Sequence, residues 1–217
     1  MDRSDKLRDG GDVGFTDDDR LRAYGRAAAH EAGHALVAWL SPLIKSVISA
    51  RWTGEVGKVT CKRHSGHPYF DWDNLASTLA GFAGEMYLFG RTRTAGQKRD
   101  LAKARDIARK LCATCDSPMK MRLWSCDDTA AAPDFSRIFT SGISTVENAI
   151  MASAYRRAYE LISLHGHKFR ILVEALGQRG EIDTKGLEAI LGKKKEDKGL
   201  VLMLLAMSDA DPNPDLQ

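Results

Sequence analysis

Apolar residues recur at three- and four-residue spacing over most of the chain, which is the period of amphipathic helices. The longest such stretch covers residues 16–40. It is predicted to start at Thr16, since the acidic residues that follow suit the positive end of a helix, and to stop at Ser41-Pro42. Residues 74–90 are apolar nearly all round, so we expect this helix to be buried. Further helices are predicted over residues 98–112, 144–165, 167–176 and 184–191, while residues 199–207 are predicted to form either a last helix or a strip that binds a partner.

Two β-leaning segments, residues 46–52 and 57–62, flank Thr53-Gly54-Glu55 and predict a hairpin. An exposed edge strand of this hairpin could pair with the backbone of an extended peptide, or the hairpin could be purely structural. The sequence does not separate these two alternatives. The predicted fold class is α+β and mainly α-helical, with a small β-hairpin or sheet and a C-terminal helical portion.

The chain is predicted to contain one domain with an extension at each end. Residues 1–15 are expected to form a flexible arm, residues 16–192 the domain, and residues 193–217 a charged linker and tail. A length of 217 residues and a hydrophobic content of 43% suffice for a single core. Residues 116–140 are rich in Ala, Pro, Asp and Ser and predict a long surface loop.

Charge and composition narrow the class of protein. The formal net charge of +3 is spread along the chain without a dense block, which argues neither for nor against nucleic-acid binding. We expect no nucleic-acid partner. The apolar run Leu200–Met207 is far shorter than the roughly 20 residues that span a bilayer, and the first residues lack a secretory signal. We therefore expect a soluble cytoplasmic protein without a membrane span, whose four cysteines are reduced thiols.

A candidate metal site lies inside the predicted helix 16–40, where the chain reads His30-Glu31-Ala32-Gly33-His34. Positions four apart lie above one another on a helix, so His30 and His34 can present their imidazoles to a single point. Imidazole nitrogens bind Zn²⁺, and a catalytic zinc has three protein ligands and one position for water. Glu31 would lie beside the metal, where it could take a proton from that water as general base. Such a pattern also occurs by chance, but the helical, apolar surroundings favour a metal site.

The third ligand must come from another segment of the chain. Asp100 lies on the apolar face at the start of the predicted helix 98–112, and an inward Asp at a helix start is either a cap or a ligand. Asp100 is therefore the best candidate. Glu85 is the one interior charge of residues 74–90, and burying it requires a partner. Glu85 could lie near the metal or its ligands, or it could form a structural pair with an arginine. The sequence leaves both alternatives open.

Three stretches of the chain together resemble the peptidase domain of FtsH-type zinc proteases, peptidase family M41. They read HEAGHALV from His30, GFAGE from Gly81 with a later Phe89-Gly90, and TAGQKRDL from Thr94. The resemblance extends more weakly to about residue 190, which is about 80% of the chain. It implies a zincin-like fold with Zn²⁺ held by His30, His34 and Asp100 and with Glu31 as general base.

The chain departs from the family pattern beside these residues. Ala80 and Phe82 stand where the family has Gly and Arg, and Met86 replaces a Glu. In the third stretch, Ala95, Gln97 and Arg99 replace Thr, Ala and Asn. Because every expected ligand and the base are retained, these changes bear on substrate handling and subunit contacts rather than on the metal.

The resemblance implies a zinc metalloendopeptidase that hydrolyses peptide bonds of unfolded or peptide-like substrates. Family members carry an ATPase domain ahead of the peptidase, usually with membrane helices, and neither fits before residue 20. Residues 186–193 also lack the spacing of a phosphate-binding loop. We therefore expect a stand-alone peptidase domain, with a separate ATPase or a homo-oligomer as possible partners. The alternative is a non-catalytic binding or regulatory protein, or an adaptor, built on the same scaffold.

A second metal site is the remaining question of ligand chemistry. Cys61, His64, Cys112 and Cys115 could form a structural zinc site, but free thiols partly in the core are favoured, because such a site needs convergence that a sequence does not reveal. The other histidines are expected at the surface or at helix ends: His67, His165 and His167.

Overall fold

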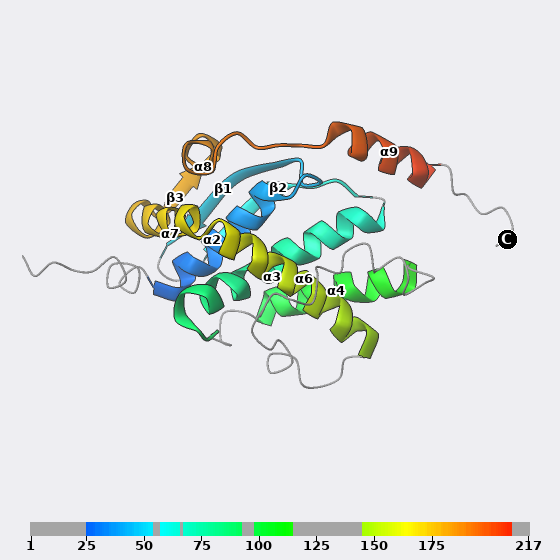
Figure 1. Cartoon of the computed structure of the whole chain (residues 1–217), viewed down its shortest axis with the longest axis horizontal. Coiled ribbons are helices and arrows are strands. Elements are labelled where there is room, and N and C mark those ends of the chain that lie inside the picture. The colour runs from blue at the N-terminus through cyan, green and yellow to red at the C-terminus, as the bar shows by residue number, and fades with distance from the viewer. Residues whose placement is uncertain (1–24, 54–56, 66, 93–97, 115–144, 210–217) are drawn as a thin grey trace, which may run out of the picture.

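The computed structural model describes residues 25–53, 57–65, 67–92, 98–114 and 145–209. Within these ranges the protein is mainly helical and has one small antiparallel sheet, as Figure 1 shows. The predicted α+β class is therefore confirmed. The predicted arm 1–15 and surface loop 116–140 lie outside the described residues.

The described elements follow one another in this order: α2 (Gly25–Leu40), β1 (Ser46–Trp52), β2 (Gly57–Lys62), α3 (Pro68–Phe89), α4 (Lys98–Thr114), α6 (Thr145–Leu164), α7 (Gly166–Arg179), β3 (Glu181–Asp183), α8 (Thr184–Leu191) and α9 (Lys198–Asp209).

The sheet has the strand order β2-β1-β3. The predicted hairpin is confirmed, because β1 and β2 have the predicted bounds and pair antiparallel. Strand β3 was not predicted. It has only three residues, too few for an alternating pattern, and it exists because Glu181–Asp183 pairs with residues 49–51 of β1. Among the described strands, β2 therefore forms one edge of the sheet.

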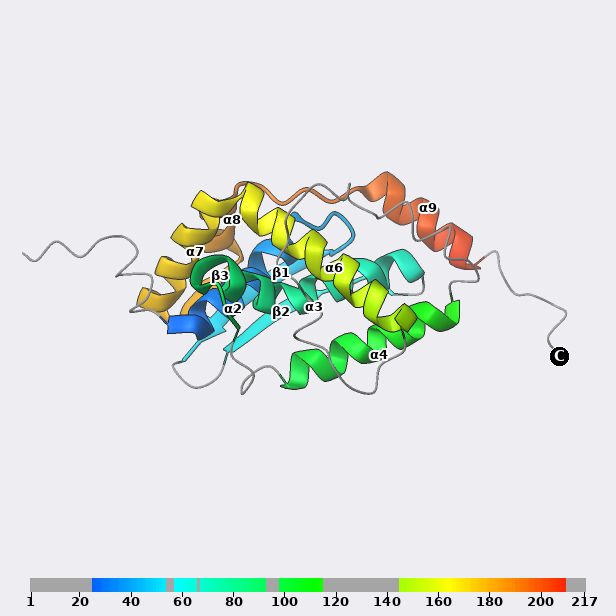
Figure 2. The same cartoon turned by 60° about the horizontal axis from the view of Figure 1, so that its bottom comes forward.

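Helices α2 and α3 lie at the centre of the fold. Helix α2 contacts β1 on one side and α3 on another, while α4 and α6 pack on α3, as Figures 1 and 2 show. The close approach of α2 and α3 depends on small residues. A side chain at Gly33 would overlap the carbonyl oxygen of Ala80. A Cβ at Gly84 would lie 2.6 Å from the carbonyl oxygen of Ala29, which is too close. Bulkier residues would separate the two helices.

Two predicted helix bounds need correction. Helix α3 starts at Pro68, not at residue 74, because Pro suits the first helical position and the His67 ring accepts a hydrogen bond from the amide of Tyr69. Helix α7 continues through Gly177 and ends before Gly180, which takes the left-handed conformation (φ 73°). The part of the predicted helix 16–40 before Gly25 lies outside the described residues.

The segment after α8 folds back onto the C-terminal end of α2. The Lys194 ammonium donates to the carbonyl oxygens of Ala38 (3.2 Å), Trp39 (2.9 Å) and Ser41 (2.9 Å). The Trp39 indole in turn donates to the carbonyl of Gly192 at 2.9 Å. The last carbonyls of a helix lack intrahelical donors and carry partial negative charge, so a lysine is well suited to this position.

Helix α9 extends the contact made by this segment. Its Val201 and Leu204 pack on Leu43 and Phe70 in a small apolar cluster apart from the main core. Part of the predicted tail 193–217 thus contacts the body of the protein, and residues 199–207, for which two alternatives were open, are helical.

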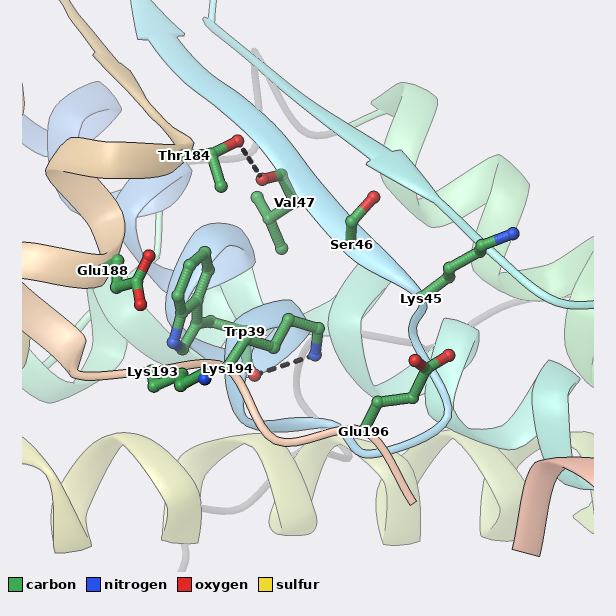
Figure 3. A pocket seen from close by; sticks show the side chains of 9 residues that line it. All are labelled: Trp39, Lys45, Ser46, Val47, Thr184, Glu188, Lys193, Lys194 and Glu196. Carbon is green, nitrogen blue, oxygen red and sulfur yellow. Dashed lines mark hydrogen bonds between the residues drawn. The ribbon is translucent and has the colours of Figure 1, made fainter. Parts of the chain in front are cut away.

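A pocket of about 250 Å³ lies beside the contact between Lys194 and α2 (Figure 3). Its lining includes Lys194 and Trp39, together with Glu188 from α8. None of the residues predicted to bind metal or to act as base lines it.

We predict that Lys194→Met lowers the free energy of unfolding by about 1–3 kcal/mol, because the helix carbonyls lose a charged donor while the apolar stem is kept. Urea unfolding followed by circular dichroism measures the change. The matched control is Lys195→Met, since Lys195 is exposed and should change stability by less than about 0.5 kcal/mol. Equal effects of the two substitutions would contradict the capping role.

Candidate metal centre

Helix α2 brings two imidazoles together. His30 and His34 are one helical turn apart, and their Nε2 atoms lie 3.0 Å from each other. The rings meet edge to face, with centroids 4.6 Å apart. His30 is only 7% exposed. Two ring nitrogens therefore point at one place on the buried side of the helix.

Asp100 reaches the same place from the first turn of α4. Its Oδ2 lies 2.9 Å from Nε2 of His30 and 3.4 Å from Nε2 of His34. Two ligands bound to zinc at about 2.0–2.2 Å with tetrahedral angles lie roughly 3.3 Å apart. This triangle of donor atoms is therefore close to the size that zinc requires, and its two shorter sides need to open slightly when an ion binds. Within the described part of the chain, this is the one group of three such side chains that could hold a metal ion.

The other nitrogen of each imidazole is held by α3. Nδ1 of His34 lies 2.7 Å from the carbonyl oxygen of Ser77, and Nδ1 of His30 lies 2.9 Å from Oε1 of Glu85. A carbonyl and a carboxylate only accept hydrogen bonds, so both Nδ1 atoms carry a proton, and Nε2 is the nitrogen of each ring that is placed to bind a metal. One of the two alternatives left open for Glu85 was a contact with a candidate ligand, and its carboxylate makes such a contact with His30.

The imidazole ring of His30 lies directly against Gly81, where the missing side chain leaves room for it. A Cβ at Gly81 of α3 would overlap the imidazole ring. The ring is thus confined between Gly81, its acceptor Glu85 and Asp100. An ordered ring of this kind loses little conformational entropy when it binds an ion.

The charges of the triad favour a cation. Burial alone would lower the pKa of His30, but its hydrogen bonds to Asp100 and Glu85 outweigh burial and raise the pKa to about 9. Burial would raise the pKa of Asp100, but the hydrogen bonds from His30 and His34 hold it well below its usual range. Asp100 is therefore anionic. A divalent ion would replace the proton held between the donors.

Glu31 lies beside this triad, under the start of β2. Its side chain is buried, and a Cβ at Gly57 would overlap its carboxylate. Burial raises the pKa of Glu31, while the nearby His34 and His30 act in the opposite direction. A carboxylate with a raised pKa next to a metal is suited to take up a proton and release it again.

Residues 21–190 match peptidase family M41. The chain belongs to this family. Among M41 relatives, it is 28% identical over 175 residues to the ATP-dependent zinc metalloprotease FtsH 2 of Symbiobacterium thermophilum, covering 76% of this chain and 30% of that protein. It is 30% identical over 177 residues to FtsH 3 of Sphaerobacter thermophilus, covering 77% of this chain and 35% of that protein. It is 25% identical over 183 residues to the human ATP-dependent zinc metalloprotease YME1L1, covering 78% of this chain and 23% of that protein.

The chain thus spans about a third or less of the length of these M41 proteins. Among the described residues, no helix has the length and apolar character needed to cross a membrane.

Two departures from the M41 pattern lie next to the triad. Phe82 stands where the pattern has Arg, and its ring packs against His30 at a centroid distance of 5.9 Å. Arg99, in the place of Asn, directly precedes Asp100 on α4. Phe82 and Arg99, which border the triad, thus both differ from the residues that the M41 pattern has at these two positions.

The other candidate ligands do not lie with the triad. His64 Nε2 contacts Glu196 at 3.1 Å, and His67 caps α3. Cys61 and Cys112 form no disulfide bond among the described residues, and Cys115 lies outside them. Among the described residues, Cys61, His64 and Cys112 do not form a group that could hold a metal ion.

Sequence reasoning missed the groups that orient the triad. The carbonyl of Ser77 carries no signal in a sequence, because every residue has one. The glycine pattern of residues 81–84 was part of the family resemblance. Its role in making room for His30 depends on how α2 and α3 cross, which the sequence does not reveal.

We predict that Glu85→Ala weakens zinc affinity about 10–100-fold, since loss of a group that orients a metal-binding histidine has effects of this size. The matched variant Glu85→Gln keeps an acceptor for Nδ1 of His30 and should weaken affinity far less. Competition with a chromophoric chelator measures both affinities, and circular dichroism checks the fold. Wild-type affinity in folded Glu85→Ala would exclude the proposed role of Glu85.

Proposed function

We propose that this chain is a zinc metalloendopeptidase. The observation that carries the proposal is the convergence of His30, His34 and Asp100, with the carboxylate of Glu31 beside them. His30, His34 and Asp100 would hold the ion. When bound, zinc supplies Lewis-acid polarisation of a peptide carbonyl and lowers the pKa of water. Glu31 takes the proton of the attacking water on its carboxylate and returns it to the leaving amine.

The number of donors supports catalysis over a purely structural role. Structural zinc sites are closed by four protein ligands, whereas catalytic sites have three and leave a position for water. The described residues offer three donors at this place. A structural site also has no need for a buried acid such as Glu31. These two points argue against the alternative of a non-catalytic binding protein or adaptor.

The position of β2 supports an extended peptide as substrate. Among the described strands, β2 pairs only with β1, so its other edge is available to a partner. Gly57, the first residue of β2, lies against Glu31. A peptide that adds to this edge by backbone hydrogen bonds would pass the base with its own backbone extended. Only an unfolded segment can do so, which favours unfolded proteins and peptides as substrates.

The M41 relatives are named ATP-dependent, and this chain spans only part of their length. We therefore include in the proposal that stably folded substrates require a separate ATPase that unfolds them, and that the zinc-loaded chain alone cleaves unfolded substrates.

We predict that Glu31→Gln lowers the rate of casein cleavage by roughly 10²–10⁴-fold, because the proton acceptor is lost, while zinc stays bound. Fluorescent casein digestion and metal analysis measure the two effects. The control is Glu188→Gln, an exposed glutamate on α8 that should leave the rate unchanged. A Glu31→Gln variant close to wild-type activity would refute the role of Glu31.

Metal removal gives an independent test. Treatment with 1,10-phenanthroline should abolish casein cleavage, and one equivalent of Zn²⁺ per chain should restore it, because three donors on a folded scaffold rebind the ion. Cleavage that persists after complete zinc removal would rule out the metallopeptidase mechanism. A zinc-loaded wild-type chain without any cleavage would favour the non-catalytic alternative.

A further inference from the structure

Three basic side chains lie together beside the candidate metal centre. They are Arg63, which follows β2, and Arg99 and Lys103 on α4, and we call them the basic rim. Lys103 is one helical turn beyond Asp100 and therefore lies on the same side of α4. Partial burial of its ammonium lowers the pKa of Lys103, although the residue as a whole is exposed, and the positive charges of Arg63 and Arg99 lower it further, while Asp100 and Cys61 act in the opposite direction. Lys103 therefore lies within reach of the charges of both arginines.

The basic rim reaches both the base and β2. The charge of Arg99 acts on Glu31, and the charges of Arg63 and Lys103 act on the thiol of Cys61 in β2. The rim thus borders the path along β2 that begins at Glu31. From Gly57 to Cys61 this path is about 13 Å long at the rise of a β-strand.

The basic rim is not neutralised within the described part of the chain. Two other cations of α4 have partners: Lys110 pairs with Asp71 at 2.7 Å, and Arg109 contacts Asp106 at 3.3 Å. By contrast, no ion pair between described residues involves a member of the rim. Asp100, whose charge acts on Lys103, is already hydrogen-bonded to His30.

Grouping like charges costs free energy, so a cluster of exposed cations next to a reaction centre favours an anionic ligand. The edge strand itself adds to this charge. Val59 and Cys61 pack against the core, whereas Lys58 and Lys62 are exposed on the opposite face of β2. Side chains of an added strand point alternately to the two faces. Acidic side chains of such a strand would therefore meet cations on both faces of β2.

We propose that the site selects extended peptides that carry Asp or Glu within about four residues of the scissile bond, on the side that lies along β2 toward the basic rim. This inference rests on the proposed peptidase function and adds a substrate class to it. A peptide is favoured over a nucleic acid, because the basic rim adjoins an edge of β2 that no other described strand pairs with, and a buried proton acceptor.

The test uses three fluorescent peptides with Glu, Gln or Lys at one position. This position is four residues from the cleaved bond, on the side that lies along β2 toward the basic rim. Binding is measured by anisotropy with zinc-loaded Glu31→Gln, and kcat/KM with the zinc-loaded wild type. We expect the Glu peptide to bind about tenfold more tightly than the Gln peptide, and the Lys peptide to bind most weakly. The preference should shrink between 50 and 500 mM NaCl, because salt screens exposed charges.

The double variant R63Q/K103Q, placed in the Glu31→Gln background for binding, should reduce the ratio of Glu to Gln peptide affinity to near one. In the same assay Lys185→Gln, an exposed lysine on α8, should leave the ratio unchanged. Equal affinities of the three peptides, a ratio that survives in the double variant, or no measurable peptide binding would each overturn the inference. A single-stranded oligonucleotide that binds more tightly than the Glu peptide would replace it with nucleic-acid binding.

The two proposals fail in different ways. If the Glu preference appears in binding but the wild type cleaves no peptide, the basic rim stands as a recognition surface and the peptidase function fails. If all three peptides are cleaved at the same rate and bind equally, the peptidase function stands and the inference fails.

Discussion

The close crossing of α2 and α3 is the constraint on which the rest of the site depends. Glycines at the crossing bring the two backbones near enough for α3 to hold the imidazoles of α2, with the Ser77 carbonyl 2.7 Å from His34 and Glu85 2.9 Å from His30. These bonds set which nitrogen of each ring faces Asp100. The small residues at the crossing thereby determine which atoms of the two imidazoles are available for binding. The same contacts give the buried imidazoles and Glu85 the hydrogen-bond partners that buried polar groups require.

Much of the fold was predictable because its signals are local. The hairpin had two β-branched segments and a turn between them. Helix α8 had Asp183 and Gly192 at its ends, and Asp183 accepts a hydrogen bond from the amide of Gly186 at 2.8 Å. The start of α3 was missed because Pro68 within a Gly- and His-containing stretch suits a loop as well as a first helical turn. Strand β3 was missed because only its partner β1 makes it a strand.

The candidate site divides in the same way. His30, Glu31 and His34 could be identified because their spacing on one helix is a local signal. Asp100 required the additional argument that an inward acid at a helix start needs a partner. The contact of Glu31 with β2 and the grouping of Arg63 with Lys103 could not be predicted, since they depend on how β2 and α4 pass the end of α2. The family match ends at residue 190, and Lys194 lies beyond it, so its bonds to α2 carried no family signal either.

A crystal structure of the zinc-loaded chain with anomalous data at the zinc edge tests the central claim most directly. The account predicts one zinc per chain, bonded to Nε2 of His30, Nε2 of His34 and a carboxylate oxygen of Asp100, with a remaining position that no protein atom fills. A zinc ion closed by four protein ligands, or bound elsewhere while these three residues keep their contacts to one another, would contradict it.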